Sequence, residues 1–185
     1  MIITVFDFDD TLFPSTEYTT TKNIDYELLS ISINELIQGA LCRSNKVFII
    51  TNANIEWVEM CCKNMNVDFN RVIVKSTIQE CMNIGPTMNW KKNMFVKFFS
   101  EYFIQQTPGV LQELVCFGDN LYDRHASLSI KKMFPYVVVK NFKFYEKPTF
   151  SDLIGEQYLI KQFFNHIYDF KVDMDKTLIK KDIYT

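Results

Sequence analysis

Two carboxylates that follow the first apolar run of the chain are the residues best suited to do chemistry. The run from Ile2 to Phe6 is rich in β-branched and aromatic side chains and stops at Asp7, which is typical of a buried strand. Side chains alternate along an extended chain, so Asp7 and Asp9 are expected to project to one side of the strand end. Two carboxylates about 4 Å apart repel by about 4 kcal/mol at an effective dielectric of about 20. The pair therefore predicts a divalent cation or a shared proton between the two groups, unless Asp7 simply starts an acidic turn.

A second group of acids follows a later apolar run. Residues 114–117 read as a strand, and Gly-Asp-Asn-Leu-Tyr-Asp follows at 118–123. If a helix begins there, Asp119 and Asp123 lie one turn apart and share a face. An acidic turn that caps a helix would explain Asp123 alone but not the whole set. Because such a cluster is costly without a hard cation, these two acids and the first pair together predict a Mg²⁺ site.

Hydroxyl and ammonium groups at other predicted element ends are candidates for binding phosphate. Thr51 closes the apolar run 47–50, where its hydroxyl can donate to a phosphate oxygen; Thr51 and Asn52 also suit the cap of a following helix. Lys91 and Lys92 stand at the predicted start of an aromatic-rich helix, where the helix dipole disfavours cations. Their position indicates a bound anion, helped by free backbone N–H groups, or else a pair of solvated surface lysines.

Apolar runs alternate along the chain with segments of helical periodicity. The runs predict strands at 2–6, 47–50, 71–75, 114–117 and 136–139, and helices are expected at 25–40, after 52, from 90, at 124–131 and at 152–170. Residues 13–21 predict a loop or small hairpin. Largely apolar strands that alternate with helices predict a parallel sheet covered on both faces. We therefore expect an α/β, Rossmann-like three-layer sandwich with a mostly parallel five-stranded sheet over 1–170, and a charged, fraying tail over 171–185.

Composition and charge argue against several other classes of protein. The 185 residues are 48% apolar and 15% aromatic, which is enough for one globular domain with a sizeable core. The net charge of −2 argues against a dedicated nucleic-acid-binding protein, and no apolar run approaches transmembrane length. The five cysteines lack Cys-x-x-Cys spacing and the chain shows no signal-peptide pattern, so we expect reduced thiols and a cytoplasmic location.

The four motifs, in this order and each at a predicted element end, resemble the signatures of the haloacid dehalogenase (HAD) superfamily of phosphoryl-transfer enzymes. Asp-Phe-Asp-Asp-Thr at 7–11, Thr51, a lysine, and Gly-Asp-x-x-x-Asp at 118–123 match its first to fourth signatures. The resemblance spans about Ile3 to Asp123. We favour Lys91 over Lys92 as the third signature because Lys91 immediately follows a tryptophan, as in similar sequences.

The resemblance implies a phosphatase or phosphotransferase that forms an aspartyl-phosphate. Asp7 would be the nucleophile, and Asp9 would protonate the leaving group and then activate the water that hydrolyses the intermediate. Asp10 fills a variable position and is given no role.

The resemblance also implies Mg²⁺ as the cofactor. The metal would be held by the Asp7 side chain, the backbone carbonyl of Asp9 and the carboxylate of Asp119, and Asp123 would ligate it or orient a bound water. Thr51, with Asn52 beside it, and Lys91 would grip the transferring phosphoryl group.

Neither position at which HAD proteins usually insert a cap domain is long enough to hold one. Residues 13–46 are expected to hold one helix, and residues 53–89 about one helix, one strand and a connector. Neither segment reaches the roughly 50 residues of an independent domain. The site is therefore expected to be open, and open members of the superfamily tend to act on large substrates such as phosphoproteins or polynucleotide ends, or borrow a lid from a partner subunit. The alternatives are a small-metabolite or nucleotide phosphatase of the same fold and a catalytically silent metal-binding module. The sequence leaves the substrate and the oligomeric state open.

Overall fold

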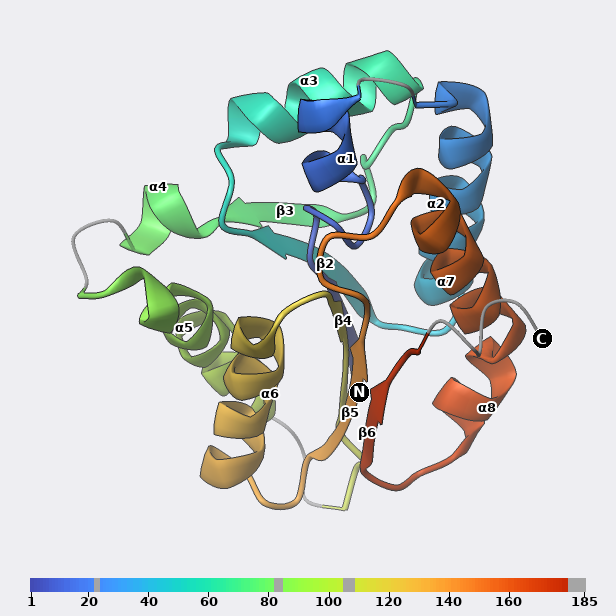
Figure 1. Cartoon of the computed structure of the whole chain (residues 1–185). Helices are drawn as coiled ribbons and strands as arrows, with labels where there is room; N and C mark the ends of the chain where they lie inside the picture. The colour runs from blue at the N-terminus through green and yellow to red at the C-terminus, as the bar shows by residue number, and fades with distance from the viewer. Residues whose placement is uncertain (22–23, 82–84, 105–108, 180–185) are drawn as a thin grey trace.

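The computed structural model describes residues 1–21, 24–81, 85–104 and 109–179. Its strands are β1 (Ile2–Phe6), β2 (Lys46–Thr51), β3 (Ile73–Ser76), β4 (Glu113–Gly118), β5 (Val138–Lys143) and β6 (Met174–Thr177). Its α-helices are α1 (Ser15–Thr20), α2 (Tyr26–Leu41), α3 (Ile55–Met65), α4 (Thr77–Cys81), α5 (Trp90–Ile104), α6 (Leu121–Met133), α7 (Phe150–Gln162) and α8 (Phe164–Asp169), and a 3₁₀ turn at Thr87–Asn89 precedes α5. Figure 1 shows how the strands and helices follow one another along the chain.

The strands form one parallel sheet in the order β3-β2-β1-β4-β5-β6. The central strand β1 pairs on both sides, with Val5 opposite Phe48 of β2 and opposite Cys116 of β4. The predicted Rossmann-like α/β sandwich with a parallel sheet is therefore confirmed, although the sheet has six strands where we expected five.

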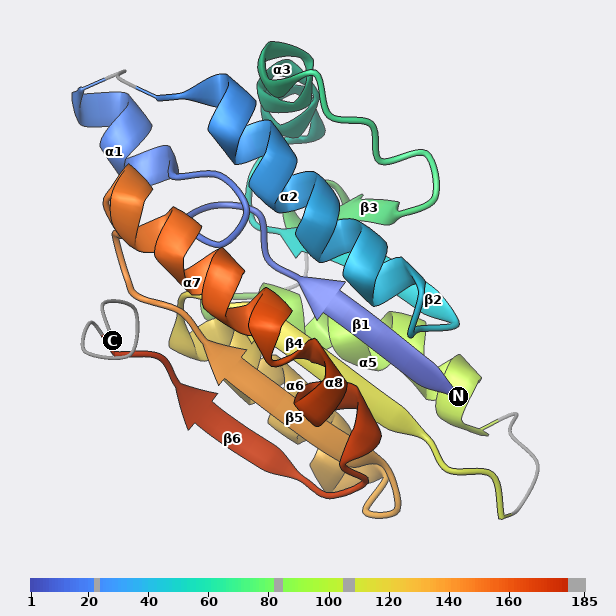
Figure 2. The ribbon, with the colours of Figure 1, turned by 90° about the vertical axis from the view of Figure 1, so that its right-hand side faces the viewer.

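Each face of the sheet carries its own apolar core, because successive side chains of a strand point to opposite faces. On one face Phe6, Ile49 and Phe117 pack against helices α2, α3, α7 and α8. On the other face Val5, Phe48 and Leu114 pack against α5 and α6. Figure 2 shows α2, α7 and α8 crossing one face while α5 and α6 lie behind the sheet. Strands buried on both sides explain the apolar runs of the sequence.

Three predicted boundaries are wrong, and polar side chains account for two of them. Strand β5 extends to Lys143 because the buried Lys140 pairs with Glu113 of β4 inside the sheet, so the strand continues through polar residues. The expected fraying tail contains β6, an edge strand with the sequence Met-Asp-Lys-Thr, which shows no apolar run. The single helix expected over 152–170 is divided at Phe163 into α7 and α8.

The segment expected as a loop or hairpin over 13–21 holds the short helix α1. Asp10, to which we gave no role, accepts hydrogen bonds from the Thr16 backbone N–H at 2.9 Å and from the Thr16 hydroxyl at 2.5 Å. Its side chain therefore satisfies a backbone donor in the first turn of α1, as capping residues do.

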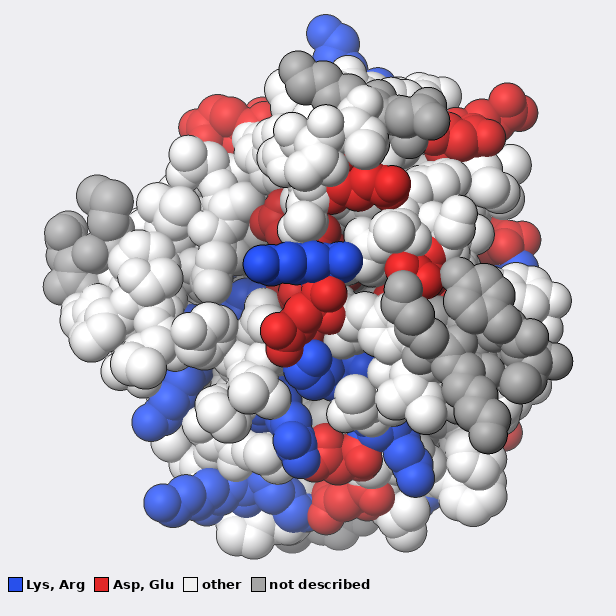
Figure 3. Space-filling model, in the orientation of Figure 1, with Lys and Arg blue, Asp and Glu red and all other residues white. Residues whose placement is uncertain are grey.

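The chain order places the carboxyl ends of β1 and β4 side by side. From β1 the chain builds β2 and β3 on one side and then returns to β4 on the other, so β1 and β4 flank the topological switch point of the sheet. Ligands of open α/β sheets bind in the crevice outside the carboxyl ends of the strands at such a point. Figure 3 shows this face, with acidic side chains gathered near its centre and lysines and arginines mostly below them. Among the described residues, no helix combines the length and apolar character needed to cross a membrane.

Candidate active site

Asp7 lies at the switch point, immediately after β1. Its backbone N–H donates to the carbonyl of Phe117 in β4 at 2.9 Å, which fixes the residue between the two strands. Its Oδ1 accepts from the Phe8 backbone N–H at 2.8 Å, and the residue is only 4% exposed. Asp7 is thus a buried carboxylate held by backbone contacts on both sides.

Lys91 links Asp7 to the fourth motif. This side chain enters from the first turn of α5, is 1% exposed, and places Nζ at 2.8 Å from Asp7 Oδ1 and at 2.6 Å from Asp123 Oδ1. Lys92, in contrast, is exposed. The structure therefore brings Lys91, the lysine that we favoured, to the carboxylates.

Asp119 and Asp123 complete a cluster of three carboxylates. Asp119 follows β4 and Asp123 lies in the first turn of α6, whose N-cap Asn120 accepts from the Tyr122 N–H at 2.8 Å and donates to Asp119 Oδ1 at 3.1 Å. One oxygen each of Asp7, Asp119 and Asp123 lies within 4.8 Å of the others. The predicted convergence of these acids at the carboxyl edge is what the structure shows.

Gly118 is needed for this packing. A Cβ on Gly118 would lie 2.5 Å from Asp123 Cγ and 2.6 Å from Asp123 Oδ2. The glycine of the Gly-Asp motif therefore makes room for the second acid of the same motif.

Burial raises the pKa of all three acids, and repulsion from neighbouring carboxylates adds to the effect at Asp7 and Asp119. Burial raises the pKa of Asp7 well above its usual value; Lys91 opposes this effect, and the charges of Asp123 and Asp119 add to it. Burial, reinforced by Asp123, raises the pKa of Asp119 to about 6, and burial also raises the pKa of Asp123. Burial alone would lower the pKa of Lys91, but the carboxylates of Asp123 and Asp7 outweigh it and raise that pKa.

The donor set fits a hard divalent cation. Asp123 Oδ2 is buried and has no hydrogen-bond partner among the described residues, so one oxygen of the cluster lacks the partner that a buried acceptor normally has. Mg²⁺ binds carboxylate oxygens in proteins. The single positive charge of Lys91 leaves the negative charge of three acids incompletely balanced, so a cation would be stabilised here. Asp7, Asp119 and Asp123 are thus the residues that could hold the metal.

Asp9 belongs to a separate polar group on the wall of the site. Its Oδ2 accepts from the Thr51 hydroxyl at 3.1 Å, and its Oδ1 accepts from Trp57 Nε1 at 2.9 Å and from the Ser15 hydroxyl. The strand ends before Asp7, so the alternation that we applied to Asp7 and Asp9 does not extend to Asp9. The carboxylate of Asp9 is not in the three-acid cluster, and the predicted metal contact through its backbone carbonyl stays a prediction.

Thr51 and Asn52 lie beside Asp9 at the end of β2. Thr51 is fully buried and its hydroxyl also accepts from the Ala53 N–H at 2.9 Å, so it supports the following turn as well as Asp9. Asn52 Oδ1 accepts from the Thr77 hydroxyl at 2.6 Å. Both residues border the site, but their phosphate contacts stay a prediction.

Two residues that sequence reasoning missed fix the loop that carries Asp9. Trp57 packs edge-to-face on Phe13 while its indole N–H holds Asp9. Gln157, in α7 and 1% exposed, donates from Nε2 to the carbonyls of Thr11 and Leu12 at 3.0 and 3.1 Å. Neither residue belongs to a motif, and no local sequence pattern marks either of them.

Replacing Gly118 with alanine is predicted to weaken metal binding about 10–100-fold, the usual range for losing support of a ligand. The new methyl group would collide with Asp123, so the effect should be smaller in an Asp123→Ala background, where the Cγ and Oδ2 atoms are absent. Isothermal titration with Mg²⁺ measures both. Equal losses of affinity in the two backgrounds would contradict the collision with Asp123.

Mg²⁺ affinity is predicted to fall as the pH drops through about 6. Because the pKa of Asp119 is raised to about 6, this carboxyl carries a proton below that pH, and the metal must displace it. The dissociation constant should rise at least about tenfold from pH 7 to pH 5, with protons released on binding at the lower pH. Titrations in buffers of different ionisation enthalpy measure the release, with far-UV circular dichroism to confirm folding at each pH. An affinity that is constant from pH 5 to 7 would contradict metal binding by an Asp119 carboxyl of raised pKa.

Comparisons with known proteins agree with this architecture. No protein-family model and no curated protein matches the sequence. Among solved structures, the HAD domain of effector protein Lem4 from Legionella pneumophila superposes with a TM-score of 0.54 at 14% identity, covering 90% of this chain and 96% of that domain. The same domain described as an inactive mutant gives a TM-score of 0.52 at 14% identity, covering 89% and 93%. At this identity the likeness concerns the fold, and the chain therefore has the HAD-like fold.

Proposed function

We propose that this chain is a Mg²⁺-dependent phosphomonoester hydrolase that acts through an aspartyl-phosphate. The observation that carries the proposal is that one buried lysine, Lys91, forms ion pairs with both Asp7 and Asp123. These two acids belong to a cluster of three carboxylates. Ionisable groups with perturbed pKa values that gather at the carboxyl edge of a parallel sheet are typical of catalytic sites.

Asp7 is the nucleophile in this proposal. Its carboxylate oxygen attacks phosphorus and forms the aspartyl-phosphate while the bond from phosphorus to the leaving oxygen breaks. Asp9 gives a proton to that oxygen, and then takes a proton from the water that attacks the intermediate. The new bond from the water oxygen to phosphorus replaces the bond to Asp7, which releases phosphate and regenerates both carboxyl groups.

The surroundings of the two acids suit these different roles. Lys91 and the Phe8 N–H hold Asp7 rigidly, so its carboxylate is oriented before the substrate arrives. Thr51 and Trp57 hold Asp9 apart from the three buried acids, where it can face the leaving group rather than the metal.

Mg²⁺ would be held by Asp7, Asp119 and Asp123, with the Asp9 carbonyl as a further ligand. When bound, it neutralises charge on the phosphoryl oxygens during transfer. Lys91 supplies further positive charge, and the Thr51 hydroxyl and the Asn52 amide are donors for the phosphoryl group. Transfer of a phosphoryl group needs such positioning and charge more than covalent help.

The described residues at the two usual cap positions form α1 and α2 in the first segment and α3, β3 and α4 in the second, with no separate domain among them. This supports an open site and a large substrate such as a phosphoprotein or a polynucleotide end. A small-metabolite phosphatase would share the same chemistry, whereas the intact set of Asp7, Asp9, Lys91 and Asp119 disfavours a silent module. All five cysteines are free thiols, which supports placing the enzyme in a reducing cytoplasm.

Replacing Asp7 with asparagine is predicted to lower kcat at least about a thousandfold, because the amide cannot form the aspartyl-phosphate. Asp9→Asn should lower kcat about 10²–10⁴-fold through loss of proton transfer. Phosphate release from phosphopeptides, 3′-phosphorylated oligonucleotides and nucleotides, with Mg²⁺ or with EDTA, measures both. Asp25→Asn is the matched control, because Asp25 caps α2 at Leu28 N–H away from the site and asparagine also caps helices. Full activity in Asp7→Asn would refute the mechanism.

A further inference from the structure

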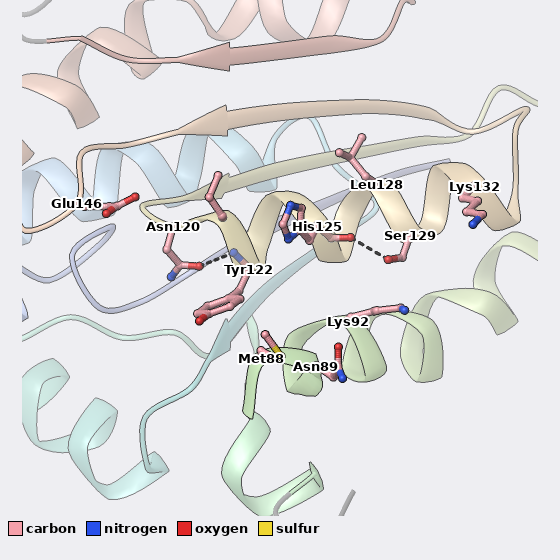
Figure 4. Close-up of a pocket in the computed structure, with 11 residues that line it drawn as sticks. Met88, Asn89, Lys92, Asn120, Tyr122, His125, Leu128, Ser129, Lys132 and Glu146 are labelled. Atoms are coloured by element: carbon pink, nitrogen blue, oxygen red, sulfur yellow. Dashed lines mark hydrogen bonds between the residues drawn. The ribbon is translucent and has the colours of Figure 1, made fainter. Parts of the chain in front are cut away.

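A groove of about 720 Å³ begins beside the metal-site acids and runs between α5 and α6. At one end it is lined by Asn120, which contacts Asp119, and by Glu146 from the segment after β5. Figure 4 shows Lys132 of α6 at the far end and Lys92 of α5 beyond Asn89, so that both lysines lie in the other half of the groove, one on each wall. We call this hollow the α5–α6 groove; none of the proposed chemistry uses it.

The two lysines of the groove differ from the basic residues near them in their ion pairing. Arg124 and Lys131, also on α6, pair with Asp175 and Asp173, and Lys143 pairs with Glu146. Within the described part of the chain, neither Lys92 nor Lys132 has a carboxylate within 4.0 Å. The far end of the groove therefore presents two uncompensated positive charges.

The residues of α6 that line the groove give the distance from its near end to Lys132. Tyr122, His125, Ser129 and Lys132 line it at spacings of three and four residues, so they share one face of the helix. Tyr122 directly precedes Asp123 of the acid cluster and so marks the near end of the groove, and at 1.5 Å per residue Lys132 lies about 15 Å beyond it. An extended peptide advances about 3.3 Å per residue and would cover that distance in four or five residues.

The chemistry of the lining favours a peptide over a polynucleotide. Met88 and Leu128 offer apolar contact for side chains, while Asn89 and Asn120 carry amides that can both donate to and accept from a peptide backbone. A nucleic-acid strand would need cations all along its backbone, but here they occur at one end and Glu146 lies at the other.

We propose that the α5–α6 groove binds the polypeptide next to a phosphorylated residue and selects acidic side chains four or five positions away, which pair with Lys92 and Lys132. This inference rests on the proposed phosphatase function, because the phosphorylated residue must occupy the site at Asp7. It narrows the substrate class to phosphoproteins with a nearby acidic segment.

Paired phosphopeptides test the groove. Each pair carries one phosphoserine, phosphothreonine or phosphotyrosine, with either Glu or Ala at the fourth and fifth positions on one side, and both directions are made. The wild type should hydrolyse the better Glu peptide with a kcat/KM at least about fivefold above its Ala partner. The double charge reversal Lys92→Glu, Lys132→Glu should bring that ratio to one or below, mainly through KM. Lys63→Glu, an exposed lysine on α3, is the matched control and should keep the preference.

Two further arms separate failure of the groove from failure of the proposed function. Hydrolysis of p-nitrophenyl phosphate by the wild type reports the function without the groove, and the absence of Mg²⁺-dependent phosphate release from this ester and from every phosphopeptide refutes the phosphatase. Binding of fluorescent Glu and Ala phosphopeptides to Asp7→Asn, measured by anisotropy, reports the groove whether or not turnover occurs. Equal binding and equal kcat/KM for Glu and Ala peptides would overturn the groove assignment. So would a charge reversal that impairs only a 3′-phosphorylated oligonucleotide, which would indicate a nucleic-acid substrate.

Discussion

The structure depends on one electrostatic constraint: three carboxylates converge on a single buried lysine. Lys91 compensates Asp7 and Asp123 directly, and breaking such a buried pair typically costs about 3–5 kcal/mol. Burial raises the pKa values of Asp7, Asp119 and Asp123, and because one positive charge cannot neutralise three acids, repulsion adds to this effect at Asp7 and Asp119. Without a metal the cluster must take up protons, and a divalent cation would relieve the repulsion instead.

The fold serves this constraint by bringing distant residues to one edge. Parallel strands deliver Asp7 from β1 and Asp119 from β4 to the same switch point, and α5 delivers Lys91. Gly118 leaves the room that Asp123 occupies. Trp57 holds Asp9 in a different environment, apart from the three clustered carboxylates. The site thus contains two kinds of carboxylate on adjoining elements.

Sequence reasoning predicted the parts of this arrangement that have a local signal. Buried strands leave apolar runs, and Asp7, Asp119 and Asp123 stand where those runs end or a helix begins, so both the fold class and the acid cluster could be predicted. The third signature is a single lysine, so the preference for Lys91 rested only on the tryptophan before it, and the structure adds that Lys91 is buried whereas Lys92 is exposed. Trp57 and Gln157 act through tertiary contacts across 48 and 146 residues, which no local pattern encodes. The polar edge strand β6 was missed because pairing to β5 and not an apolar run defines it.

Thermal unfolding tests the electrostatic constraint most directly. The wild type and Asp119→Asn are compared at pH 7, each with EDTA and with millimolar Mg²⁺. In EDTA the variant should have the higher Tm, because it lacks one of the three repelling charges. Mg²⁺ should raise the Tm of the wild type, because at a hundredfold excess over its dissociation constant the bound metal adds about 2.7 kcal/mol to the free energy of unfolding. The Tm of the variant should rise much less. A wild-type Tm that ignores Mg²⁺, together with a variant that is less stable in EDTA, would contradict the account.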